Sequence, residues 1–368
     1  MNAQTQISGQ ISGQISDLPK QPLRITLLAG GVGGAKMAEG LMHSHYCNSH
    51  YCNSHFCNSN ESQNSNPLKI IGNVADDQTF HGLWVSPDID TLIYTLADMI
   101  DRDKGWGLAG DTDHTLKALN RLGRETWMLL GDQDFATHIY RTEQRALGVR
   151  PSEIAANIAR QLGVKAEILL PTDDVIQSWV STDKGWLDFQ DYFVRERCEP
   201  AVKSFTVIGA DNATPTPEAL RAIAEADLLV LAPSNPIASI GAILAVPGIR
   251  QAVLDTSAYR IAVSPLIQGE TVKGPADKMM QASGFSADVL GVADCYQGLI
   301  DGMLIDQLDR DAISHLQARG LDVLATDTLM QSRQSKIRVA ETLVQFYLSH
   351  CQSHCGQRLT ESRQEGVS

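Results

Sequence analysis

Short runs of apolar residues alternate with amphipathic stretches along most of the chain. The amphipathic stretches have helical spacing, as at Leu92, Leu96 and Ile100, where apolar side chains recur every three or four residues. This spacing predicts helices over residues 35–42, 91–100, 113–122, 135–147, 152–162, 217–225, 237–244 and 249–254. The apolar runs predict strands over residues 23–29, 68–74, 166–170, 205–208, 228–231 and 260–263, with a smaller β element at 185–189.

The order of these elements predicts the fold class. Because strands alternate with helices, parallel βαβ units are expected, and they assemble into an α/β, Rossmann-like, doubly wound and mainly parallel sheet. We expect residues 23–350 to form one such domain, with a helical or mixed subdomain at about 135–200. Ligands of such sheets bind beyond the carboxyl ends of the strands, so the segments that directly follow strands are the candidates for chemistry.

Three polar segments fall outside this pattern. Residues 1–22 repeat a Gln-Ile-Ser-Gly unit and predict a disordered tail, and residues 351–368 predict a flexible one. Residues 43–67 form a low-complexity insertion in which a Ser-His-Tyr/Phe-Cys-Asn unit occurs three times. The repeated His and Cys allow a zinc site, but no His/Cys pair has the spacing of a zinc finger, and the alternative is an inert solvated loop.

Composition narrows the range of partners. Lys and Arg number 30 against 43 Asp and Glu, and the formal net charge of -13 disfavours a broad nucleic-acid surface. No apolar run reaches the ~18–20 residues of a membrane helix, and the first 22 residues lack the apolar core of a signal peptide. We therefore expect a soluble cytoplasmic protein, without nucleic-acid or membrane partners, whose seven cysteines are reduced.

A glycine-rich loop joins the first predicted strand to the first predicted helix. Gly30, Gly31, Gly33 and Gly34 allow close approach of a ligand, and the helix start offers free N–H groups and the positive end of the helix dipole. Lys36 adds a positive charge, so the loop predicts an anion site. It is neither a P-loop nor a full dinucleotide fingerprint. The alternative is a tight turn that needs glycine for packing alone.

Four aspartates follow the second predicted strand within a short distance. Asp76 and Asp77 come directly after it, and Asp88 and Asp90 precede the helix expected to start at residue 91. Two residues apart in an extended segment, Asp88 and Asp90 are expected to face the same side. Converging carboxylates form the oxygen-rich site that Mg²⁺ prefers, so we expect all four to be metal ligands. For Asp90 the alternative is a helix N-cap.

Further polar residues stand where ligands are expected. His138, Arg141 and Arg145 share one helix face and could hold a phosphate or carboxylate, the alternative for Arg145 being a solvated face. Trp106 lies between two glycines and could stack on a planar ring, or be buried. Candidate nucleotide contacts at the later strand ends are Ser234, Asn235 and Ser264, and a Gly/Pro turn with lysines follows at 273–278. The alternative for each of these segments is an ordinary loop without a ligand.

Taken together, these segments resemble the 2-phospho-L-lactate transferase family of deazaflavin coenzyme F-420 biosynthesis. The resemblance runs in order from about residue 24 to about 347 and rests on segments 30–36, 76–77, 86–91, 105–107, 130–138, 232–236 and 264–265. It implies a Mg²⁺-dependent transferase. The ribityl hydroxyl of 7,8-didemethyl-8-hydroxy-5-deazariboflavin would attack the distal phosphorus of a guanosine diphosphate diester that carries a phospholactyl, phosphoenolpyruvyl or phosphoglyceryl group. GMP would leave, and coenzyme F-420-0 or its dehydro form would result.

The resemblance also implies roles for particular residues. Asp76 and Asp90 correspond to catalytic carboxylates near the metal, and Asp90 and Leu129 fall where the family contacts the deazaflavin. Some members carry a basic residue at the position of Leu129, so leucine there is a departure. The substrate-binding residues expected in this chain are Asp90, Thr91, Trp106, Leu129, His138 and Arg141. We also expect a homodimer.

Two other protein classes fit parts of the sequence. One is a non-enzymatic, nucleotide-sugar-binding regulator of the gluconeogenesis-factor kind, which shares the glycine loop; segments 130–132 and 233–236 argue against complete identity with that class. The other is a nicotinamide oxidoreductase, which is disfavoured because no ribose-binding acid follows the second strand in the expected context.

Overall fold

A seven-stranded parallel sheet forms the centre of the computed structural model, which describes residues 23–47 and 68–365, with side chains as far as Gln352. The strand order is β14-β13-β10-β9-β1-β2-β5, and every neighbouring pair is parallel. The strands are β1 (Ile25–Ala29), β2 (Leu68–Gly72), β5 (Glu167–Leu169), β9 (Leu228–Leu231), β10 (Tyr259–Val263), β13 (Gly302–Asp306) and β14 (Asp322–Thr326). The predicted doubly wound α/β fold is confirmed.

The strand order reverses direction between β1 and β9. From β1 the chain moves outward through β2 to β5, then crosses back to β9 and moves outward in the other direction. The loops after β1 and β9 therefore leave adjacent strands toward opposite halves of the sheet, which is where doubly wound proteins bind their ligands.

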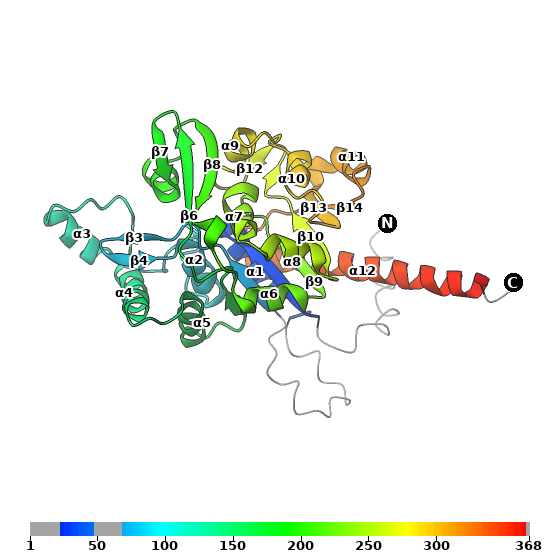
Figure 1. Cartoon of the computed structure of the whole chain (residues 1–368), viewed down its shortest axis with the longest axis horizontal. Helices are drawn as coiled ribbons and strands as arrows, with labels where there is room; N and C mark the ends of the chain where they lie inside the picture. The colour runs from blue at the N-terminus through cyan, green and yellow to red at the C-terminus, as the bar shows by residue number, and fades with distance from the viewer. Residues whose placement is uncertain (1–22, 48–67, 366–368) are drawn as a thin grey trace, which may run out of the picture.

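Helices cover the sheet on both faces (Figure 1). Those of the first half are α1 (Gly31–His43), α2 (Pro87–Leu96), α3 (His114–Arg121), α4 (Asp132–Ala146) and α5 (Pro151–Gln161). Those of the second half are α6 (Pro217–Ala224), α7 (Gly241–Ala245), α8 (Ile249–Asp255), α9 (Ala276–Ala282), α10 (Val289–Cys295), α11 (Ile313–Gln317) and α12 (Arg333–Glu365). Short helical turns are η2 (Asp191–Arg195), η3 (Ala210–Asn212), η4 (Pro236–Ile240) and η5 (Gln307–Ala312).

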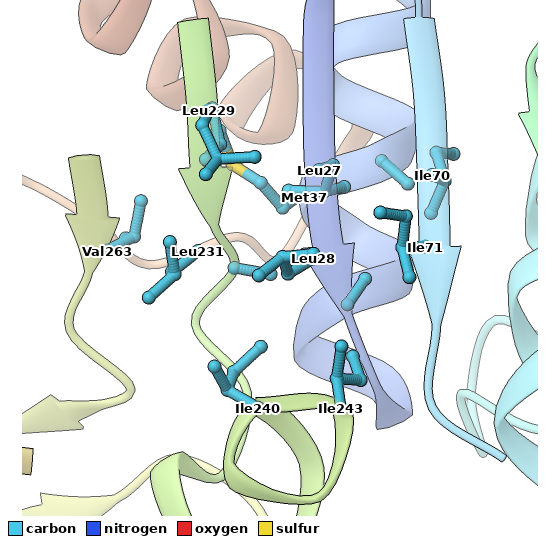
Figure 2. Packing of buried hydrophobic residues seen from close by; sticks show 14 of the residues in the cluster. Leu27, Leu28, Met37, Ile70, Ile71, Leu229, Leu231, Ile240, Ile243 and Val263 are labelled. Atoms are coloured by element: carbon cyan, nitrogen blue, oxygen red, sulfur yellow. The ribbon is translucent and has the colours of Figure 1, made fainter. Parts of the chain in front are cut away.

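The main core lies on both sides of β1. Successive strand residues point to opposite faces, so Leu27 and Leu28 pack against different helices. Figure 2 shows Met37 of α1 between β1 and β9, and Ile240 and Ile243 beneath Leu28 near the carboxyl ends of the strands. All five side chains are fully buried, which anchors the starts of α1 and α7 at this edge of the sheet.

Three small β structures accompany the main sheet in the described residues. The hairpin of β3 (Gln78–Phe80) and β4 (Leu83–Val85) packs with α3 and α4 around a separate small core. A three-stranded antiparallel sheet consists of β6 (Gln177–Thr182), β7 (Gly185–Asp188) and β8 (Val202–Ile208). A two-stranded ribbon of β11 (Leu266–Ile267) and β12 (Glu270–Thr271) follows β10.

Several helices begin earlier than the sequence pattern predicted. Helix α1 begins at Gly31 rather than 35, α2 at Pro87 rather than 91, and α4 at Asp132 rather than 135. Proline suits the first position of a helix, and glycines inside α1 are tolerated because neighbouring backbone leaves no room for a Cβ. The sequence pattern assigned no elements after residue 263, where the structure has β11–β14 and α9–α12.

The polar segments are described only in part. The predicted tail 1–22 and most of the repeat insertion lie outside the described residues. Of the first repeat unit, Ser44 caps the end of α1 through Leu41, and the His45 imidazole pairs with Glu341 of α12. Helix α12 continues to Glu365, and the flexibility of residues 351–368 stays a prediction.

Membrane-spanning character was tested over the described residues. None of their helices is by itself long and apolar enough to cross a membrane. One bent pair, Pro236–Ala245 with Ile249–Asp255, meets the criteria of length and composition across an 89° bend.

Candidate active site

The loops after β1 and β9 pack directly against each other at the carboxyl edge of the sheet. Ser234 Oγ donates to the Gly30 carbonyl at 2.7 Å and accepts from the Gly30 N–H at 3.1 Å. A Cβ at Gly33 would stand 2.0 Å from the Pro233 carbonyl oxygen, and one at Gly34 would stand 2.9 Å from the Ala29 methyl group. The two loops therefore meet at this edge, and the packing explanation accounts for Gly33 and Gly34.

The polar side chains predicted to contact a nucleotide hold the loops together in this structure. Asn235 accepts from the N–H groups of Ile237 and Ala238 at 2.9 and 3.1 Å, which caps the η4 turn. Ser264 Oγ accepts from the Leu266 N–H at 3.1 Å and donates to its carbonyl at 3.0 Å. With Ser234 occupied as well, the loops offer a ligand mainly their backbone, and side-chain contact to a nucleotide stays a prediction.

Asp76 and Asp88 meet beside the start of α1. The Asn73 amide donates to Asp76 at 3.1 Å and to Asp88 at 3.0 Å, and the Gly31 N–H donates to Asp88. Both carboxylates are at least nine-tenths buried. Burial, and then the charge of Asp88, raise the pKa of Asp76 well above its usual range, and burial raises the pKa of Asp88 to about 6. Two buried carboxylates so close together are unfavourable when both are ionised.

Asp77 lies next to this pair but faces different partners. It accepts hydrogen bonds from the Ser86 hydroxyl at 2.7 Å and the Trp84 indole N–H at 3.1 Å. Burial raises the pKa of the Asp77 carboxyl to about 7. One oxygen of Asp77 and one of Asp76 are buried with no hydrogen-bond partner among the described residues.

Asp90 forms a buried ion pair with Arg141 of α4. The guanidinium engages both carboxylate oxygens, through Nη1 at 3.0 Å and through Nη2. His138 lies between two acids, with Nδ1 3.7 Å from Asp90 and Nε2 3.3 Å from Asp134, and the Tyr94 hydroxyl donates to Asp134 at 2.8 Å. Arg141 and His138 are thus placed to hold Asp90, and their contact with substrate stays a prediction.

The expectation that Asp88 and Asp90 face the same side is wrong. Both lie in the first turn of α2, which begins at Pro87. Side chains two positions apart in a helix differ in direction by about 200° around the helix axis. Asp88 therefore points to Asp76 and the start of α1, whereas Asp90 points to α4. The helix also begins too early for Asp90 to be its N-cap, which is Ser86.

The remaining predicted residues surround this edge at different depths. Thr91 is buried in α2 beside Asp90. Trp106 is 37% exposed, with Lys104 Nζ 5.5 Å from its ring centre. Leu129 is 58% exposed, and Arg145 stacks on the Trp84 ring at 4.1 Å. The half-buried Lys36 follows the glycines on α1, and burial, then the charges of Lys336 and Lys273, lower the pKa of its ammonium group.

Two groups of side chains were compared as metal sites. Ligand atoms of Asp90, Asp134 and His138 lie within 4.8 Å of one another, but Arg141 already engages both oxygens of Asp90. Asp76 and Asp88 fit a divalent cation better, because they are adjacent acids and Asp76 has a buried oxygen without a hydrogen-bond partner among the described residues.

Three contributors to the site were missed from the sequence. The sequence pattern indicated no site role for Asn73, Asp134 or Tyr94. Asn73 directly follows β2, and that position could have identified it. Tyr94 stands four residues after Asp90 on the same helix face, which places it beside the same network.

Comparison with known proteins gives a consistent set of relatives. The family described as 2-phospho-L-lactate transferase CofD matches residues 25–344. A phosphoenolpyruvate transferase of Streptomyces coelicolor is 35% identical over 324 residues, covering 86% of this chain and 96% of the relative. A 2-phospho-L-lactate transferase of Methanococcoides burtonii is 33% identical over 321 residues, covering 87% and 98%.

Solved structures support the fold alone. The protein BH3568 of Bacillus halodurans superposes with a TM-score of 0.55 at 15% sequence identity. The match covers 89% of this chain and 100% of that chain. At this identity the similarity describes the arrangement of strands and helices.

Proposed function

The chain belongs to the 2-phospho-L-lactate transferase CofD family, and from this premise we propose that it transfers a phosphorylated three-carbon acid to a deazaflavin. The donor is a guanosine diphosphate diester, and the acceptor is the ribityl hydroxyl of 7,8-didemethyl-8-hydroxy-5-deazariboflavin. The observation that carries the proposal is the family match over residues 25–344, which spans the whole carboxyl edge of the sheet. Nothing in the comparisons favours the nucleotide-sugar-binding regulator.

The reaction breaks a phosphoanhydride bond of the donor and forms a phosphate ester with the acceptor. The ribityl oxygen forms a bond to the distal phosphorus, the bond from that phosphorus to the GMP oxygen breaks, and the hydroxyl proton is released. Phosphoryl transfer asks the protein mainly for positioning and for stabilisation of charge on the phosphate oxygens. The residues at this edge are suited to both tasks.

The start of α1 is the part of the site proposed to bind the donor phosphates. Its first N–H groups are free of intrahelical partners and carry the positive end of the helix dipole. The half-buried Lys36 supplies a positive charge one turn later. Asp88, which accepts from the Gly31 N–H, places a carboxylate next to the same turn.

Asp76 and Asp88 are the residues that would hold Mg²⁺. The ion would neutralise the two adjacent acids and the charge that develops on the transferring phosphate. Asn73 fixes both carboxylates by donating to each. In this assignment Asp90, held by Arg141, orients the acceptor hydroxyl from the neighbouring side of α2.

The proposal is tested by offering the purified protein the deazaflavin with each guanylylated three-carbon acid in turn. We expect GMP and a product whose mass equals the deazaflavin plus the phospho-acid, for at least one of the lactyl, enolpyruvyl and glyceryl donors. Because relatives named for phosphoenolpyruvate and for 2-phospho-L-lactate are similarly close, the assay has to include both donors. No product with any donor would overturn the assignment.

The metal assignment is tested separately in the same assay. Asp76→Asn should lower turnover by at least 100-fold at saturating Mg²⁺, because a direct ligand is lost. The exposed Asp103→Asn, remote from this acidic pair in sequence, is the matched control and should behave as the wild type. Wild-type turnover by Asp76→Asn, or turnover unaffected by EDTA, would refute a role for Mg²⁺ here.

A further inference from the structure

Two lysines near the glycine loop have no acidic partner among the described residues. Lys36 and Lys273 form no ion pair there, and neither do the exposed Lys165, Lys203 and Lys278, whereas Lys69, Lys104, Lys117, Lys184 and Lys336 each do. The chain carries 43 acids against 30 basic residues, so acidic partners are plentiful. For the half-buried Lys36, the missing acidic partner indicates that its partner is a bound anion, and the exposed Lys273 reaches toward the same helix turn.

Lys273 lies in the turn between β12 and α9 and reaches back to the glycine loop. Its Nζ donates to the Lys104 carbonyl at 2.6 Å. A Cβ built on Gly105 would be 3.4 Å from Lys273 Nζ and 3.2 Å from Val32 Cγ1. Since Val32 belongs to the first turn of α1, the Lys273 ammonium stands beside that turn, although 241 residues separate the two in sequence.

Lys36 lies close enough to Lys273 for the two charges to repel. Burial, then the charges of Lys336 and Lys273, lower the pKa of Lys36, and burial lowers the pKa of Lys273. Lys336 is neutralised by its ion pair with Glu39. The repulsion between Lys36 and Lys273 is left without compensation in the described structure.

We propose that Lys273 is a donor-binding residue which, together with Lys36, binds the guanosine-distal phosphate of the donor beside the first turn of α1. The inference rests on the proposed function, because that function supplies the two-phosphate ligand. A phosphate there would separate the two ammonium groups and accept a charge-assisted hydrogen bond from each. It would also adjoin the N–H groups at the start of α1.

A purely structural role for Lys273 makes a different prediction. Through the Lys104 carbonyl, Lys273 joins the turn 273–275 to the segment 104–106. Glutamine can keep that hydrogen bond but carries no charge, and arginine keeps both. Comparing Lys273→Gln with Lys273→Arg therefore separates the charge from the tether.

The test is titration calorimetry with GDP and with GMP on the full chain. Lys273→Gln and Lys36→Gln should each weaken GDP binding by about 10–100-fold, the loss of one charge-assisted contact. GMP lacks the distal phosphate, so its affinity should change less than about threefold. Lys273→Arg should retain GDP affinity within about threefold, and Lys203→Gln, an exposed lysine of β8, should match the wild type.

Three results would overturn the inference. Unchanged GDP affinity in Lys273→Gln, with deazaflavin binding and melting temperature intact, leaves Lys273 a structural tether. Equal losses for GDP and GMP place the lysine at the other phosphate. A wild-type protein that binds no GDP and forms no product overturns the proposed function together with this inference, which distinguishes the two failures.

Discussion

Replacing Arg141 by methionine should destabilise the protein strongly, although this arginine lies on a helix face that the sequence presents as polar. The guanidinium is 4% exposed and holds both oxygens of the equally buried Asp90. Methionine fills a similar volume but supplies no charge. The Asp90 carboxylate would then be buried without its cation.

The size of the effect follows from that uncompensated charge. Removing one partner of a buried ion pair costs about 3–5 kcal/mol. His138, 3.7 Å from Asp90, can replace only part of the lost interaction. At about 2 °C per kcal/mol for a chain of this size, the melting temperature should fall by about 6–10 °C.

A double-mutant cycle with Asp90→Asn isolates the pair itself. Asp90→Asn removes the buried charge, so the double variant should be more stable than Arg141→Met by about 2 kcal/mol or more. The control is Arg145→Met, one turn further along α4, where loss of stacking on Trp84 should cost about 1 kcal/mol. Thermal melts and turnover are measured on the wild type, the two single variants, the double variant and the Arg145→Met control.

The two readouts distinguish stability from activity. Arg141→Met and the double variant should both be inactive, because one mispositions Asp90 and the other lacks its carboxylate. A melting temperature for Arg141→Met within 2 °C of the wild type would refute the buried pair as described. So would a double variant that is less stable than either single variant.

Three further predictions concern other parts of the molecule. The pKa values of Asp77 and Asp88 are raised to about 7 and about 6, so between about pH 4 and pH 7 the folded protein binds protons that the unfolded chain has released. In EDTA the melting temperature should therefore fall as pH rises from about 4 to above 7. A melting temperature that does not change with pH would contradict these pKa shifts. Gly33→Ala should weaken GDP binding by at least tenfold, because its Cβ would displace the Pro233 carbonyl. The control is Gly123→Ala, where no atom lies within 4 Å of the added Cβ and only the stability cost of a positive φ is expected. Equal GDP affinities in the two variants would contradict the packing argument. Deleting residues 49–58 should leave turnover within about twofold of the wild-type value, because Ser44 and His45 of the first repeat unit keep their contacts with α1 and α12. A large loss of turnover, together with zinc that the wild type retains through dialysis, would instead identify a metal site.

The parallel direction of the strands, and the single edge at which their loops meet, could be predicted from the sequence. Parallel βαβ units leave every strand pointing the same way, so the segments after β1, β2 and β9 had to share one edge. Buried strands such as Leu228–Leu231 are apolar throughout, so they can be recognised from this one sequence. The glycine loop and the paired loops at this edge followed from that topology.

Side-chain partners could not be predicted in the same way. The predicted start of α2 at residue 91 left Asp88 and Asp90 in an extended segment, where residues two positions apart face the same side. Because α2 begins at residue 87, each position turns the side-chain direction by about 100°, and the two carboxylates point apart. The sequence indicates Arg141 as a contact for a phosphate or carboxylate ligand, and its actual partner, Asp90, could not be identified because it is 51 residues away. Short strands such as β13 carry too few residues for their period to distinguish strand from helix.

The arrangement of charge around α1 makes donor binding depend on a cation. Near its first turn lie both Asp76 and Asp88, which repel an anion, and Lys36 and Lys273, which attract one. Neutralising the acidic pair removes the repulsion and leaves the attraction, so GDP should bind at least tenfold more tightly with Mg²⁺ than in EDTA. Asp76→Asn removes a metal ligand, so Mg²⁺ should add little to the GDP affinity of this variant. Equal GDP affinities of the wild type with and without Mg²⁺ would show that the acidic pair and the donor phosphates are too far apart to interact.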